Sequence, residues 1–138
     1  MAQSLKKVLL IKKTSKFEML KKASSSVLAF SKEDQYVQEF EGHYNTIFKL
    51  CALFRHQMEK EGFDVVLKRE RDILDSDMTD KDLCITLGID STFFRGAGII
   101  RNNSPLLGVN ILPHVNKCWF SGAELDPEDD IGSIKNII

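Results

Sequence analysis

Residues 83–94 read LCITLGIDSTFF, a stretch in which a buried strand leads through a short turn into a helix. The run Asp82–Gly88 is apolar without strict alternation, which is typical of a strand buried on both faces of a parallel sheet. The residues that follow predict a helix over Thr92–Ile100, whose small side chains allow close packing against a sheet. This strand–turn–helix unit predicts an α/β fold.

Three more strands and one long helix are expected around this unit. Short apolar runs bounded by charged residues, Gly or Pro predict strands at Lys6–Lys13, Phe63–Arg69 and Pro105–Ile111. An amphipathic helix ending at Gly62 is predicted from an apolar stripe at helical spacing. The stripe consists of Tyr44, Ile47, Phe48, Cys51, Phe54 and Met58. The order of elements predicts an open, mostly parallel, Rossmann-like sheet with flanking helices.

The predicted elements divide the chain into two parts. Residues 1–113 form the predicted α/β domain, which includes a long irregular excursion over Thr14–Asp34. Residues 114–138 show little periodicity and carry a run of acidic side chains. For this second part we expect either an irregular acidic C-terminal tail or the start of a missing second domain.

The composition argues against several classes of protein. The 138 residues carry a formal net charge of −1, whereas general nucleic-acid binding requires clustered positive charge. No apolar stretch reaches the roughly 18–20 residues that a bilayer-spanning helix requires. The three cysteines are widely spaced and fit reduced thiols in an intracellular protein better than a disulfide framework. We therefore expect neither a nucleic acid nor a membrane as a partner.

Asp90 stands where the central strand ends and the next helix is about to begin. In open parallel sheets, ligands bind beyond the carboxyl ends of the strands, and helix N-termini attract anions such as phosphate. A carboxylate there repels phosphate unless it holds a metal or takes a proton from an attacking hydroxyl. Asp90 is therefore either a general base beside a nucleotide or an N-cap of the helix, and its spacing alone favours the cap.

One stretch around Asp90 resembles a known family. LGIDSTFFRGA (87–97) is similar to the G-G-D-G-T loop of the NAD kinases, which follows a buried strand and opens a helix. Gly88, Asp90 and Thr92 stand at the positions of the first Gly, the Asp and the Thr of that loop. Diacylglycerol kinases and phosphofructokinases use similar loops, so the identification depends on further stretches in the same order.

Two other stretches resemble the NAD kinases in the expected order. PLLGVNILP (105–113) is similar to the next strand of the family, which ends in G-[IV]-N, here Gly108–Asn110. VLLIKKTSKFE (8–18) is similar to the first strand and loop of the mitochondrial-type branch. The resemblance covers most of residues 7–113 and implies that this α/β domain binds nucleotides.

The resemblance implies phosphoryl transfer from ATP to the 2′-hydroxyl of NAD, giving NADP, with Mg²⁺ as the divalent metal. It makes Asp90 the group that activates the attacking hydroxyl. The phosphate path would be lined by Gly88, Ser91 and Thr92. Lys13 would contact phosphate from the end of the first strand, and Asn110 would belong to the nucleotide site. A solvated lysine at the end of a strand explains Lys13 equally well.

The chain departs from the family pattern in two ways that predict weak or absent kinase activity. Ile89 and Ser91 stand where the loop has glycines, which let backbone N–H groups approach phosphate. Family members run to roughly twice this length and have a second, β-rich domain that grips NAD, which is not evident in this sequence.

Two other interpretations stand beside a kinase. One is a non-catalytic relative of the NAD kinases that binds a nucleotide or a partner. The other is a flavodoxin-like or response-regulator-like signalling domain, which is disfavoured because lysines stand where the acidic pocket is expected after the first strand. The family resemblance further implies a homo-oligomer in the mitochondrion or the cytoplasm.

Overall fold

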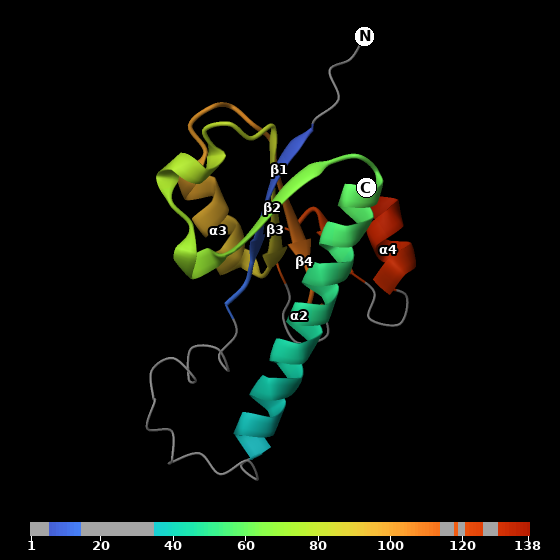
Figure 1. The fold of residues 1–138 in the computed structure, drawn as a ribbon. Coiled ribbons are helices and arrows are strands. Elements are labelled where there is room, and N and C mark those ends of the chain that lie inside the picture. Colours follow the sequence, from blue (N-terminus) through green and yellow to red (C-terminus); the bar gives the residue numbers. More distant parts are fainter. Residues whose placement is uncertain (1–5, 15–34, 114–117, 119–120, 126–129) are drawn as a thin grey trace.

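The computed structural model describes residues 6–14, 35–113, 118, 121–125 and 130–138. Within these residues the chain forms an α/β fold in which helices flank an open sheet of five parallel strands (Figure 1). The prediction of an α/β fold with an open parallel sheet is confirmed. Most of the predicted excursion lies outside the described residues.

The four predicted strands are all present, together with a fifth. In chain order the elements are β1 (Lys7–Lys12), α2 (Gln35–Lys60), β2 (Asp64–Arg69), η2 (Glu70–Asp72), η3 (Asp75–Met78), β3 (Leu83–Gly88), α3 (Asp90–Ile99), β4 (Leu106–Asn110), β5 (Ala123–Glu124) and α4 (Asp130–Ile137). None of the helices in the described ranges is long and apolar enough to cross a bilayer.

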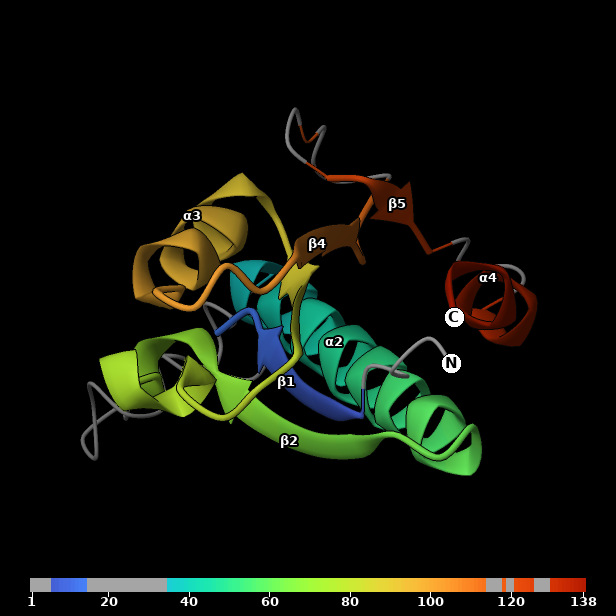
Figure 2. The same cartoon turned by 90° about the horizontal axis from the view of Figure 1, so that it is seen from above.

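The order of the strands determines where a ligand can bind. The strands lie in the order β2-β1-β3-β4-β5 (Figure 2). From β1 the chain moves to one side through α2 and β2, and then returns to the other side to form β3. In doubly wound sheets the binding crevice lies at the carboxyl ends of the strands where the order reverses. Here that point is the carboxyl end of β1 and β3.

The sheet separates two apolar cores. Figure 2 shows α2 and α4 on one side of the strands, with α3 and the η segments on the other side. Val8 and Leu10 contribute to the core under α2 and α4, whereas Leu9 and Ile11 contribute to the core under α3. Burial on both faces explains why β1 is a continuous apolar run rather than an alternating one.

Helix α2 buries much of the predicted stripe and ends as expected. Gly62 follows it with a φ of 94°, a left-handed conformation that favours glycine and stops the helix. The prediction that Phe48 belongs to the buried stripe is wrong, because Phe48 is 58% exposed. Leu50, which is not part of the predicted stripe, is only 3% exposed. Ile47, Leu50 and Cys51 lie on the side of the helix that packs against the sheet. Phe48 therefore lies at the side of the helix, next to β2.

The C-terminal residues, for which we expect either an irregular acidic tail or the start of a second domain, contain two regular elements. β5 pairs parallel with β4, and α4 packs against α2. Leu125 and Ile134 are at most 1% exposed and belong to the larger core. A strand of two residues and a helix of eight show too little periodicity to be recognised from sequence alone.

Candidate functional site

Three predicted site residues meet at the carboxyl edge of the sheet. The backbone N–H of Lys13 donates to the carbonyl of Leu87 at 2.9 Å, which places Lys13 beside the end of β3. Gly88, the last residue of β3, is paired in register with Asn110 at the end of β4. The parallel ladder therefore brings Lys13, Gly88 and Asn110 together from three separate segments of the sequence.

Gly88 is required at this edge by close packing. A Cβ atom at this position would lie 2.9 Å from the Thr92 Cβ and 3.0 Å from the Lys13 Cβ. Real Cβ atoms almost never approach other atoms this closely, so any side chain at Gly88 would push these neighbours apart. The glycine thus allows the end of β1, the end of β3 and the first turn of α3 to touch.

Helix α3 begins two residues earlier than predicted. The N–H of Phe93 donates to the carbonyl of Ile89 at 3.1 Å, so Ile89 is the cap residue and Asp90 is the first residue of the helix. The interpretation of Asp90 as the N-cap is therefore wrong. A half-buried carboxylate in the first turn is still favoured by the helix dipole.

Thr92 supports the turn between β3 and α3. Its side chain is fully buried, and its Oγ1 accepts a hydrogen bond from the N–H of Ile89 at 3.4 Å. In this conformation the hydroxyl faces the turn, and Ser91 is the exposed hydroxyl of the first turn. Of the predicted phosphate-contacting residues, Thr92 shapes the site from within, whereas Ser91 can reach a ligand from solvent.

The replaced glycines do not strain the turn. Ile89 has a φ of −123° and a ψ of −174°, an extended conformation that a β-branched residue adopts readily. Asn103 is the only non-glycine residue with positive φ in the described part of the chain, so Ser91 is not left-handed either. Ile89 and Ser91 are therefore compatible with this backbone. They differ from glycines in that their side chains occupy space beside the turn.

Asn110 also has a structural role at the edge. It is fully buried, and its Oδ1 accepts a hydrogen bond from the N–H of Leu112 at 3.0 Å. This bond turns the chain just after β4, in the manner of an Asx turn. The buried amide thereby holds the rim of the crevice beside Gly88.

Glu70 links the ends of β1 and β2, which the sequence did not predict. Its carboxylate accepts the N–H of Thr14 at 3.1 Å, and its carbonyl accepts a bond from Arg95 at 3.2 Å. The Thr14 side chain is buried, and its Oγ1 has no hydrogen-bond partner among the described residues. The only sequence signal for these contacts is that Glu70 directly follows β2 and Thr14 stands two residues after β1.

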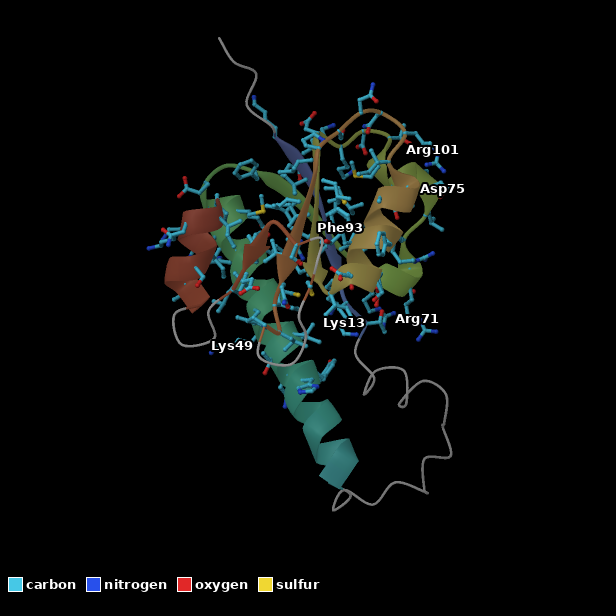
Figure 3. All side chains as sticks on the ribbon, turned by 180° about the vertical axis from the view of Figure 1, so that it is seen from behind. Lys13, Lys49, Arg71, Asp75, Phe93 and Arg101 are labelled. Atoms are coloured by element: carbon cyan, nitrogen blue, oxygen red, sulfur yellow. The ribbon has the colours of Figure 1, made fainter. Side chains whose placement is uncertain are left out.

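Positive side chains gather at this end of the sheet. Lys12 ends β1 and Lys13 follows it, and Arg69 and Arg71 stand on either side of Glu70. Figure 3 shows Lys13 and Arg71 at the same end of the molecule, where β1 and β2 finish. Of these side chains, Lys13 packs next to Gly88 at the start of α3, whereas the Lys12 ammonium lies over Phe48 of α2 and Arg69 pairs with Asp72. A cation near a helix N-terminus favours an anion such as phosphate.

Cys84 is not a candidate for chemistry at this edge. Cys84 lies at the start of β3, away from the carboxyl edge, and burial raises the pKa of its thiol to about 12. A thiol with this pKa is neutral at physiological pH and a poor nucleophile. Cys84 is therefore a small core residue, as its place in the predicted strand indicated.

The residues that could hold a metal are few. Among the described residues, no group of three or more His, Cys, Asp or Glu side chains converges on one point. Mg²⁺ in phosphoryl transfer is commonly held by one or two carboxylates and by the phosphates of the nucleotide. The loop between β3 and α3 supplies one carboxylate, that of Asp90 at the start of α3. In comparisons with known proteins, no family model and no curated protein matches the chain.

Proposed function

We propose that this chain is a relative of the NAD kinases that binds a nucleotide at the carboxyl edge of its sheet, between β1 and β3. The observation that supports it most is the convergence of Lys13, Gly88 and the N-terminus of α3 at the point where the strand order reverses. Ligands of open α/β sheets bind at such points.

The charges at this edge suit a phosphorylated ligand. The first N–H groups of α3 carry the positive end of the helix dipole, and the positively charged Lys13 packs through its Cβ next to Gly88 at the same edge. A phosphate placed there would interact with both without moving the backbone. The 2′-hydroxyl of NAD is the acceptor that the resemblance implies, and ATP is the donor.

In the proposed reaction, Asp90 takes the proton from the attacking hydroxyl while the γ-phosphoryl group of ATP moves to the hydroxyl oxygen. The bond between the γ-phosphorus and the bridging oxygen breaks, and ADP leaves. Mg²⁺, when bound with ATP, supplies charge neutralisation at the phosphates. Lys13 orients the phosphates, and Asn110 with Gly88 keeps the edge in shape.

A second candidate function is nucleotide binding without catalysis. It is favoured by the side chains of Ile89 and Ser91, which occupy the space that glycines leave open in the family loop.

A signalling domain is the third possibility. The order 2-1-3-4-5 is also found in flavodoxin-like sheets, but Lys12 and Lys13 stand where the acidic pocket of a response regulator would be.

The test combines binding and turnover on the full chain. We expect ATP and NAD to bind in calorimetric titrations with Mg²⁺, and NADP to form slowly at high protein concentration. Asp90→Asn should retain binding and abolish NADP formation. Asp75→Asn is the matched control, because Figure 3 shows Asp75 well separated from Lys13.

The outcomes distinguish the candidates. Binding without NADP formation in the wild-type chain supports the non-catalytic relative. Equal NADP formation by wild type and Asp90→Asn removes Asp90 from catalysis. If neither ATP nor NAD binds, the proposal of a nucleotide site at this edge is refuted.

A further inference from the structure

Strand β2 presents an open edge of the sheet. It lies at one end of the row of strands (Figure 2). The N–H of Asp64 donates to the carbonyl of Lys6 at 2.6 Å, so the backbone of Asp64 faces β1. In a parallel ladder the alternate residues Val65, Leu67 and Arg69 then direct their N–H and C=O groups away from the sheet. The described residues supply no partner strand for this edge.

Apolar side chains are exposed beside this edge on both faces of the sheet. On the face covered by α3, Val66 of β2 is 36% exposed. On the other face a groove of about 290 Å³ lies between β2 and α2, with Leu67, Phe48 and Lys12 in its lining. The Lys12 ammonium lies 5.7 Å from the centre of the Phe48 ring. None of the predicted site residues lines this groove, and Lys12 is the one residue named at the carboxyl edge that does.

We propose that β2 pairs antiparallel with β2 of a second copy of the chain, so that one sheet continues across both copies. The two-fold axis would pass through Val66, which then lies opposite Val66 of the second copy. Val65 lies opposite Leu67 of the other copy, and their outward N–H and C=O groups form the new hydrogen bonds. Such self-complementary pairing is the isologous contact of a two-fold dimer.

The charges on β2 favour this register over the one centred on Leu67. Only the alternate residues Val65, Leu67 and Arg69 direct backbone groups outward, and these must lie opposite one another in the two copies. The two-fold axis therefore passes through a single residue of the strand and not between two residues. Centring on Val66 places Asp64 opposite Lys68 of the second copy, twice in the dimer. Centring on Leu67 would place Asp64 opposite Glu70, which is repulsive. Lys68 already contacts Asp77 at 2.8 Å, and its ammonium has two further N–H donors for the second carboxylate.

The same symmetry accounts for the groove. An axis perpendicular to the sheet keeps both α2 helices on one face of the continuous sheet, on either side of the junction. The groove next to Leu67 then opens toward the second copy, and the exposed Phe48 lies in the same region. This inference does not depend on the proposed nucleotide site, which lies at the carboxyl edge.

The oligomeric state of the full chain is the first test. Sedimentation velocity from micromolar to near-millimolar concentration should show a monomer–dimer equilibrium. Val66→Lys places two ammonium groups on the axis and should raise the dissociation constant about tenfold or more. Leu74→Lys is the matched control, since Leu74 is 60% exposed and lies outside β2. A monomer throughout, or a dimer unaffected by Val66→Lys, overturns the proposal.

Two further experiments test the register and remain informative if Val66→Lys does not fold. Val66→Cys should form an intermolecular disulfide on oxidation, because two residues on the axis face each other in a non-hydrogen-bonded pair, whereas Leu74→Cys should not. Asp64→Lys and Lys68→Glu should each weaken self-association, and mixing the two variants should restore dimers through opposite charges at every position. Absence of the disulfide, or of dimers on mixing, refutes this register.

Discussion

The α-carbon of Gly88 lies so close to Thr92 that a methyl group there would come within 2.9 Å of the Thr92 Cβ. The contact joins the end of the central strand to the first turn of the helix that follows it. Lys13 approaches the same α-carbon from the neighbouring strand. The carboxyl edge of the sheet is thus closely packed around a residue without a side chain.

Gly88→Ala is therefore expected to destabilise the chain. Forcing a methyl group into this contact should lower the free energy of unfolding by about 1–3 kcal/mol. It should also weaken ATP binding, because Lys13 and the N-terminus of α3 are pushed apart. Urea denaturation and calorimetry measure the two effects.

Gly98→Ala provides the control for Gly88→Ala. Gly98 lies in α3, the helix that follows Gly88, and a Cβ there would meet nothing within 4 Å. This change should raise the free energy of unfolding by up to about 1 kcal/mol, because Ala is the better helix former. Equal effects of the two substitutions would contradict the packing argument.

Thr92→Val should remove a hydrogen bond while preserving the shape of the side chain. The N–H of Ile89 would lose its acceptor in a half-buried turn, and we expect a loss of about 1 kcal/mol in the free energy of unfolding. Thr79→Val, at an exposed threonine, should change it by less than about 0.5 kcal/mol. If both variants unfold at the same urea concentration, the Thr92 hydroxyl does not stabilise the turn.

Ile89→Gly tests what the missing loop glycine does. Because Ile89 is already extended, the substitution relieves no backbone strain, but it opens space beside the N-terminus of α3. We expect ATP to bind several-fold more tightly and the melting temperature to fall, since glycine has more conformational freedom in the unfolded chain. Ile100→Gly, just after the other end of α3, should lower the melting temperature without changing ATP affinity. Unchanged ATP binding in Ile89→Gly would count against a phosphate beside this turn.

Asp82 should make stability depend on acid pH. Hydrogen bonds from the N–H groups of Lys7 and Lys6 lower the pKa of its carboxyl group below the ordinary value. A folded-state pKa below the unfolded-state value means that the stabilisation is present at neutral pH and is lost as the pH falls through the folded-state pKa. Asp82→Asn should therefore lower the melting temperature at neutral pH.

The difference in melting temperature between wild type and Asp82→Asn should shrink as the pH is lowered past the ordinary aspartate range. Thermal unfolding followed by circular dichroism across acid and neutral pH measures it. Asp75→Asn, at an exposed position on η3, should follow the wild-type curve. A constant difference at all pH values would mean that the Asp82 side chain acts through packing or shape and not through its charge.

The sequence by itself determined the elements whose signals are local. The apolar run of β1, the turn at Gly62 and the strand–turn–helix unit around Gly88 each depend on neighbouring residues, and each is present in the structure. The placement of Lys13, Gly88 and Asn110 at one edge also follows from sequence, because residues that end parallel strands must meet there.

Only the tertiary structure decided the contacts between distant segments. The bond between Thr14 and Glu70 joins residues separated by 56 positions, and no local pattern encodes it. The exposure of Phe48 depends on which side of α2 meets the sheet, and the short β5 and α4 are held by β4 and α2. Periodicity reports which residues share a face of one element, whereas packing decides which faces meet, and that choice involves the whole chain at once.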